Sequence, residues 1–284
     1  METPISFFLR GAAGNLFAMY YAPAEAEPDF GDILYVHPFA GEMFASRTVI
    51  AACARDLAAA GFGVLTVDLY GCGDSSGDFS DARWEIWRDD LVAAVQWLQA
   101  QGRDRLSLWG LRLGALLATD FAAYSRLDFE RIILWQPVVT GRNMLTQFFR
   151  MNLDEADTLV ADRLTSPEQR RLLRDEEKIE VAGYGLAPAL IRAVDRLEIG
   201  VFGKNASAPI HWVEFSDARN LPAESRRVVE DWNRNGVRVT TTMMASGPFW
   251  LFPHGTDPAP LAKWFAATLR DAETAAENTF QKNN

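Results

Sequence analysis

Residues Leu108-Trp109-Gly110-Leu111-Arg112-Leu113-Gly114-Ala115 decide the fold. They join a short strand predicted over 105–109 directly to a helix predicted over 113–124. The two glycines allow a sharp turn between strand and helix without Cβ clashes. This layout is that of a nucleophile elbow, which presents its middle residue in a pocket at the helix N-terminus. In a working elbow the middle residue is serine, cysteine or aspartate, whereas here it is Arg112.

Strands and helices alternate along the chain on both sides of this stretch. The hydrophobic patterns predict strands over 5–10, 16–21, 32–37, 63–68, 105–109, 131–138, 209–215 and 237–243. They predict helices over 46–60, 84–98, 113–124 and 261–275. This order is typical of an α/β fold, with a mostly parallel sheet covered by helices on both faces.

A segment rich in charge and helix-forming residues interrupts the alternation. It spans 140–207, is most charged over 153–180 and contains no clear strand. We therefore predict that 1–139 and 208–284 form the α/β core. Residues 140–207 are predicted to be a helical cap over the carboxyl edge of the sheet.

The composition excludes several classes of function. The 284 residues carry a formal net charge of −10 and are 49% hydrophobic, with a pI near 4.9. This acidity argues against nucleic acid and anionic lipid as partners. No apolar run reaches the ~18–20 residues of a membrane span, and we see no secretory signal. The two cysteines form no metal-binding motif, so we expect no metal, no cofactor and a cytoplasmic location.

Several further motifs carry a family resemblance. They are His37-Pro38-Phe39, the turn 68–77 (DLYGCGDSSG), the segment 82–87 (ARWEIW) and Gly247-Pro248-Phe249-Trp250. With the elbow, they resemble the α/β-hydrolase superfamily and, more narrowly, the exosortase A system-associated hydrolase 2 family. The resemblance implies an eight-stranded type of sheet with a cap. It also implies an acyl-ester or thioester hydrolase linked to exopolysaccharide or protein sorting.

Arg112 stands at the family's nucleophile position. A guanidinium stays protonated near neutral pH, so it is no nucleophile. One interpretation is a cation paired with a nearby carboxylate. The other is a cation that binds an anionic group of a ligand, beside a helix N-terminus that already favours anions. In both interpretations we expect an anionic group beside the Arg112 guanidinium.

Of the other two positions of a catalytic triad, the acid position has a candidate residue and the histidine position is altered. Asp217 best matches the acid position, with Glu214 as the alternative, and we hypothesise an ion pair between Asp217 and Arg112. The histidine position falls on Trp250. His254 follows four residues later and is a candidate general base whose chain order fits but whose spacing does not.

An oxyanion hole needs only backbone N–H groups, so it can survive these changes. The motif assigns these groups to Phe39 and Leu113, although Phe39 is equally suited to a pocket wall. His37 begins the same loop. Ser75, Ser76 and Cys72 are candidate substitute nucleophiles, for which turn-forming roles are the better interpretation.

Three functions compete on these observations. The first is a capped hydrolase acting on an ester or thioester, which the resemblance supports. The second is a pseudo-hydrolase that binds an acyl or anionic ligand or a protein partner, which the loss of nucleophile and base supports. The third is a non-covalent enzyme in which Arg112 orients an anionic substrate and another base activates water.

Overall fold

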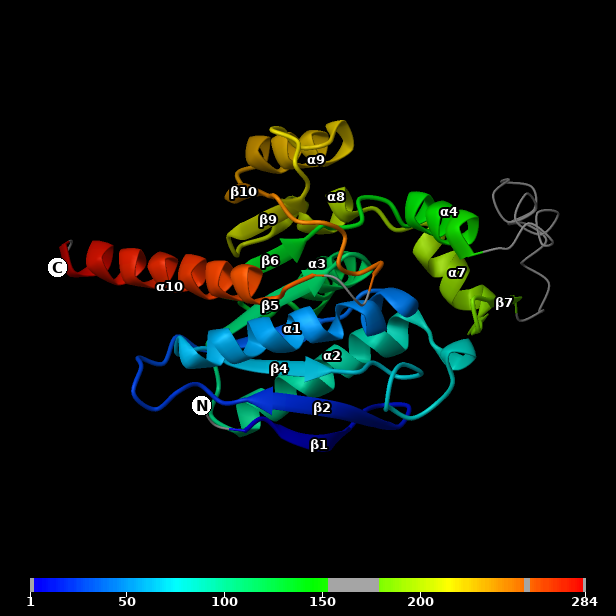
Figure 1. Cartoon of the computed structure of the whole chain (residues 1–284), viewed down its shortest axis with the longest axis horizontal. Helices are drawn as coiled ribbons and strands as arrows, with labels where there is room; N and C mark the ends of the chain where they lie inside the picture. Colours follow the sequence, from blue (N-terminus) through cyan, green and yellow to red (C-terminus); the bar gives the residue numbers. More distant parts are fainter. Residues whose placement is uncertain (1–2, 153–178, 253–255, 283–284) are drawn as a thin grey trace.

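The computed structural model describes residues 3–152, 179–252 and 256–282. Its main sheet has the strand order β1-β2-β4-β3-β5-β6-β9-β10, shown in Figure 1. β1 and β2 form an antiparallel hairpin, β2 pairs antiparallel with β4, and the other neighbours are parallel. The strands are β1 Ile5–Arg10, β2 Asn15–Tyr21, β3 Asp32–Val36, β4 Gly63–Val67, β5 Leu106–Leu111, β6 Ile132–Trp135, β9 Ile210–Phe215 and β10 Val239–Met244. This confirms the predicted α/β-hydrolase architecture.

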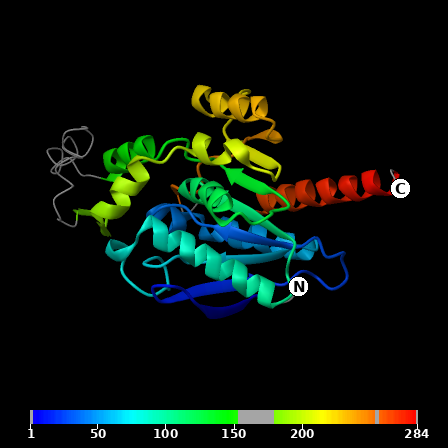
Figure 2. The ribbon, with the colours of Figure 1, turned by 180° about the vertical axis from the view of Figure 1, so that it is seen from behind.

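Helices cover both faces of this sheet. On one face α1 (Gly41–Ala59) packs against α10 (Ala259–Lys282). On the other face lie α2 (Trp84–Ala100) and α3 (Leu113–Ser125), as Figure 2 shows from behind. α9 (Ala223–Arg234) contributes Trp232 to the same core.

The central strands are buried on both faces. Every residue of β3, β5 and β6 is buried. Along β3, Ile33 and Tyr35 face the core beneath α1 and α10, whereas Leu34 and Val36 face the core beneath α2 and α3. This two-residue alternation is that of a strand between two helix layers. The sheet therefore holds the elbow, at the end of β5, on a rigid support.

The segment between β6 and β9 contains more than helices. Its elements are α4 (Gly141–Asn152), β7 (Ile179–Val181), β8 (Tyr184–Leu186), α7 (Pro188–Asp195) and α8 (Ile199–Phe202). The expectation of no strand is wrong here, because β7 and β8 form a small antiparallel hairpin. Ala182 and Gly183 both have positive φ angles, as a two-residue hairpin turn requires. Most of 153–180 lies outside the described residues, and the boundaries of the cap remain a prediction.

Two short 3-10 helices, η1 (Phe79–Asp81) and η4 (Gly203–Asn205), complete the described elements. Among them, no helix is both long enough and apolar enough to cross a membrane. α1 begins at Gly41, five residues before the predicted start at Ser46. This earlier start places Glu42 in the first turn of α1, with consequences for the site.

Candidate functional site

The elbow has the backbone geometry that its sequence predicts. Arg112 connects β5 to α3 with a φ of 56° and a ψ of −118°, a conformation that costs a non-glycine residue about 1–3 kcal/mol. A Cβ on Gly110 would collide with the backbone of α3, and one on Gly114 with the carbonyls that end β3. The Arg112 N–H donates to the Trp135 carbonyl at 2.9 Å. The strained residue is therefore fixed between neighbouring strands.

The Arg112 side chain is paired with a carboxylate, which is the first of the two interpretations that the sequence left open. Its Nε lies 3.2 Å from Oε1 of Glu42, and the two side chains are only 16% and 14% exposed. Its guanidinium carbon lies 5.5 Å from the ring centroid of Trp250, a cation–π distance. The two residues that the sequence motifs assign to the histidine and nucleophile positions are thus in contact.

Glu42 is a candidate site residue that the sequence did not identify. Burial raises the pKa of its carboxyl, whereas Arg112 and the backbone amide of Phe39 lower it. Its second oxygen, Oε2, is buried and has no hydrogen-bond partner among the described residues. An acidic residue directly after the His-Pro-Phe-Ala-Gly loop is the signal that could have found it.

The predicted ion pair between Asp217 and Arg112 is not formed. Asp217 is exposed beyond the end of β9, and the described partner of Arg112 is Glu42. The alternative acid, Glu214, is buried and accepts hydrogen bonds from Trp212 Nε1 at 3.0 Å and from Ser225 Oγ at 2.5 Å. Glu214 therefore ties β9 to α9 and does not pair with the elbow.

The two histidines that the structure describes are both occupied elsewhere. His37 is buried, its Nδ1 lies 2.8 Å from the Pro38 carbonyl, and its Nε2 accepts the Leu69 N–H at 3.2 Å. Burial lowers the pKa of His37, so a neutral ring joins the ends of β3 and β4. His211 lies at the start of β9, at the opposite edge of the sheet from the elbow. His254 falls outside the described residues, so its role as a base stays a prediction.

The candidate substitute nucleophiles have structural roles. Ser75 Oγ donates to the Asp68 carbonyl at 2.5 Å and accepts the Phe17 N–H at 2.8 Å. Ser76 Oγ accepts an N–H from the β1–β2 hairpin at 3.0 Å. Cys72 is buried, and burial raises the pKa of its thiol far above neutrality. These contacts support turn formation, as the sequence favoured.

A cavity of about 280 Å³ opens beside the elbow. Its walls are mostly apolar or aromatic and come from the oxyanion loop, α1, α4, the β7–β8 hairpin and the segment before α10. The lining includes Phe39, Glu42, Phe44, Arg112, Met144, Phe148, Tyr184, Trp250 and Leu251. Phe39 meets Phe148 edge to face at 5.1 Å between ring centroids. The pocket-wall role proposed for Phe39 is therefore visible in its contacts.

The described part of the chain offers no candidate metal site, since no group of three or more His, Cys, Asp or Glu gathers there. Leu113 opens α3 and its side chain is buried. Its backbone N–H and that of Phe39 remain the predicted oxyanion donors. The arrangement thus offers a fixed cation, a buried carboxylate and aromatic walls, with neither a hydroxyl nor a thiol at the elbow.

Comparisons with known proteins place these features in a family. The family model described as serine aminopeptidase, S33, matches residues 42–184. Among solved structures, Est1E from Butyrivibrio proteoclasticus with bound ferulic acid is 16% identical, with a TM-score of 0.69 over 93% of this chain and 98% of that one. Proline iminopeptidase from Mycobacterium smegmatis is 14% identical, with a TM-score of 0.64 over 96% and 100% of the two chains. No match was found among the curated proteins.

Proposed function

We propose that this chain, which belongs to the serine aminopeptidase S33 family of α/β-hydrolases, uses its elbow to bind a small ligand without attacking it covalently. One observation carries the proposal. The elbow presents a guanidinium, held by Glu42 and by the ring of Trp250, where a covalent mechanism needs a nucleophile. The protein is then a pseudo-hydrolase with a retained pocket.

The two terminal nitrogens of Arg112 indicate which chemical group the ligand contains. Glu42 occupies Nε, and the two terminal nitrogens form no hydrogen bond with a described residue. Two terminal nitrogens of one guanidinium form a planar fork that matches a carboxylate or phosphate. The ligand chemistry we propose is therefore an acidic group that binds this fork.

The walls of the cavity indicate the rest of the ligand. Phe39, Phe148 and Trp250 present aromatic surface to the space beside Arg112. At the rim, Phe44 is 70% exposed and Leu251 is 36% exposed. Exposed apolar side chains around a concave site favour an apolar ligand body. An organic acid with an acyl or aromatic body fits both the fork and the walls.

Binding of a matched pair of ligands tests this proposal. We expect octanoate to bind more tightly than its neutral amide in isothermal titration calorimetry. The Arg112→Gln variant should lose about tenfold or more of the octanoate affinity, because a hydrogen bond to a charged group is worth about 1.5–3 kcal/mol. It should keep its affinity for the amide. Arg219→Gln, which removes an exposed arginine outside the cavity, is the charge-matched control and should bind as the parent does.

Hydrolysis of an ester or thioester is the second candidate, favoured by the family membership and by the predicted oxyanion donor at Leu113. Turnover of activated esters, with mass spectrometry for an acyl adduct, separates the two functions. An acyl adduct on the parent protein would refute the binding proposal. Turnover without an adduct, which survives alanine at Ser75, Ser76 and Cys72, would establish attack by water.

The narrower setting rests on the sequence motifs alone. The resemblance to the exosortase A system-associated hydrolase 2 family supports a role in exopolysaccharide or protein-sorting metabolism. The two cysteines, which form no metal-binding motif, support a cytoplasmic location. A protein partner at the apolar rim is the alternative to a small ligand, and failure of every small acid to bind would favour it.

A further inference from the structure

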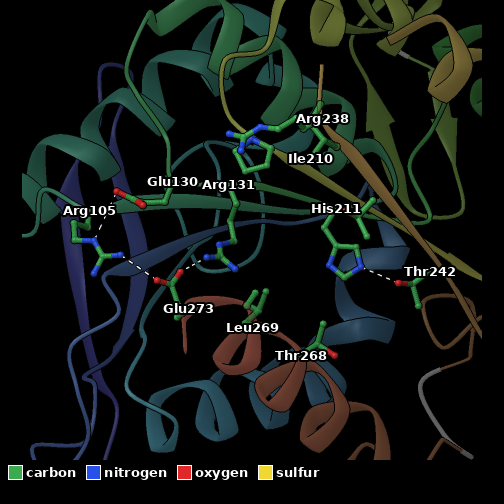
Figure 3. Close-up of a pocket in the computed structure, with 13 residues that line it drawn as sticks. Arg105, Glu130, Arg131, Ile210, His211, Arg238, Thr242, Thr268, Leu269 and Glu273 are labelled. Carbon is green, nitrogen blue, oxygen red and sulfur yellow. Dashed lines mark hydrogen bonds and ion pairs between the residues drawn. The ribbon is translucent and has the colours of Figure 1, made fainter. Parts of the chain in front are cut away.

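A second and larger cavity lies beside the amino-terminal ends of β6 and β9. It has a volume of about 950 Å³, within the range of small-molecule sites. Ile210 and His211 begin β9 at its wall, and Thr268 and Glu273 of α10 lie opposite, as Figure 3 shows. Since the elbow follows the carboxyl end of β5, this cavity is remote from Arg112 and shares no lining residue with the first.

The charges on its walls are unusual for so acidic a chain. The protein carries a net charge of −10, yet three arginines line this cavity against two glutamates. These residues are Arg105, Arg131, Arg238, Glu130 and Glu273. His211 adds no charge near pH 7, because burial and the neighbouring Arg131 lower its pKa to about 4. The described wall is therefore positive by one charge.

Glu273 satisfies only part of this positive charge. It is buried on α10 and forms ion pairs with Arg105, at 3.1 Å, and with Arg131. The Nε of Arg131 is buried and has no hydrogen-bond partner among the described residues. Arg238 is exposed and forms no ion pair with any described residue. Arg238 thus has no counter-charge among the described residues, and the partly exposed Arg131 keeps one nitrogen without a partner.

Neutral polar groups lie beside these cations. Thr240, Thr242 and Thr268 are among the residues that line the cavity. His211 Nε2 lies 2.9 Å from Thr242 Oγ1, and Figure 3 shows this pair next to Arg131. Hydroxyl and guanidinium donors together are the groups that hold phosphate and carboxylate oxygens.

We propose that this cavity binds a small multivalent anion of the phosphate or polycarboxylate type, with Arg238 and Arg131 as its cations. The site is independent of ligand binding at the elbow. Glu273 holds Arg131 in place from α10, while Arg238 reaches the anion from the start of β10. The remaining oxygens of the anion take hydrogen bonds from the threonines.

Calorimetric titration with pyrophosphate tests the site, and a titration with citrate shows whether phosphate or carboxylate is preferred. We expect Arg238→Gln to weaken pyrophosphate binding about tenfold or more. Arg238 is exposed, so the variant should fold. Arg234→Gln, which changes an exposed arginine on α9 outside the cavity, removes the same charge and should change the affinity by less than about twofold. The component of pyrophosphate binding that Arg238→Gln weakens should persist in Arg112→Gln, because the two cavities share no lining residue.

Histidine NMR signals locate the anion. Pyrophosphate should shift the imidazole signals of His211 and leave those of buried His37 in place. No binding of either anion at millimolar concentration would overturn the proposal. Equal losses in Arg238→Gln and Arg234→Gln would also overturn it, because the anion would then respond to overall charge. Binding that leaves the His211 signals unmoved would place the anion elsewhere and overturn it as well.

Discussion

Replacing Glu42 by glutamine removes the carboxylate that faces Arg112 and leaves the guanidinium without a counter-charge. Breaking a buried ion pair by removing one partner costs about 3–5 kcal/mol. Two features of this pair reduce that figure. Both side chains keep about one-seventh of their surface exposed, and a glutamine oxygen can still accept the Nε–H bond. Glutamine is also neutral, so the variant avoids the cost of burying a charge, the same cost that raises the pKa of Glu42. We therefore expect a loss of about 2–3 kcal/mol in the free energy of unfolding.

A double-mutant cycle measured by denaturant unfolding isolates the pair. Its members are Glu42→Gln, Arg112→Met and the double variant. The loss of stability in the double variant should be smaller than the sum of the two single losses, by a coupling energy of about 1–3 kcal/mol. Glu230→Gln is the matched control, because its partner Arg226 lies 4.0 Å away and both side chains are more than half exposed. That control should change the stability by less than about 0.5 kcal/mol.

Two results would refute the reasoning. If Glu42→Gln and Glu230→Gln have equal effects, the buried pair contributes no more than a surface pair. If the losses in the cycle add without coupling, Arg112 has another counter-charge. Either result would also weaken the proposed ligand site, because a fixed guanidinium is what makes a preorganised fork.

Two further predictions concern the framework around the site. Asp90 is buried, and burial raises its pKa to about 7; between pH 4 and 7 the folded protein keeps a proton that the unfolded chain has lost. The parent should therefore lose up to about 1.4 kcal/mol of stability per pH unit across that window relative to Asp90→Asn. Asp128→Asn removes an exposed carboxylate and is the control; an equal decline of the parent relative to this control would contradict the prediction. Gly114→Ala should cost more than about 2 kcal/mol, because the new Cβ meets the carbonyls of β3. Gly247→Ala, with open space around its Cβ position, should cost less than about 0.5 kcal/mol, and similar melting temperatures for the two glycine variants would count against the elbow geometry.

The sequence predicts the parts of this protein that depend on local pattern. The alternation of strands and helices, and the spacing of Gly110 and Gly114, identify the sheet and the elbow because both follow from backbone sterics. The β7–β8 hairpin was missed because each of its strands has only three residues. Its turn at Ala182 and Gly183 does not stand out within a charged segment.

The partner of Arg112 could not be predicted from local pattern. Glu42 and Arg112 are 70 residues apart, and they meet only because α1 begins five residues before its apolar periodicity indicates. The family resemblance favours Asp217 because it implies an acid after the strand that is β9 in the structure. Family position specifies where a backbone lies, whereas pairing depends on which side chains then reach one another.

The elbow shows that the backbone geometry of a turn does not determine the chemistry of the side chain it presents. The strained turn depends on Gly110, Gly114 and the bonds to β6, none of which requires a serine at position 112. Arginine in the same turn reaches further than a serine would, and its side chain extends to Glu42 and Trp250. The guanidinium thereby lines the cavity beside the elbow. A guanidinium that stays protonated cannot attack an acyl group, but it can bind the carboxylic acid that hydrolysis of an ester would produce. Under the proposed function, the residue at one position and the carboxylate that balances it turn the elbow of this fold into a binding site for an acid.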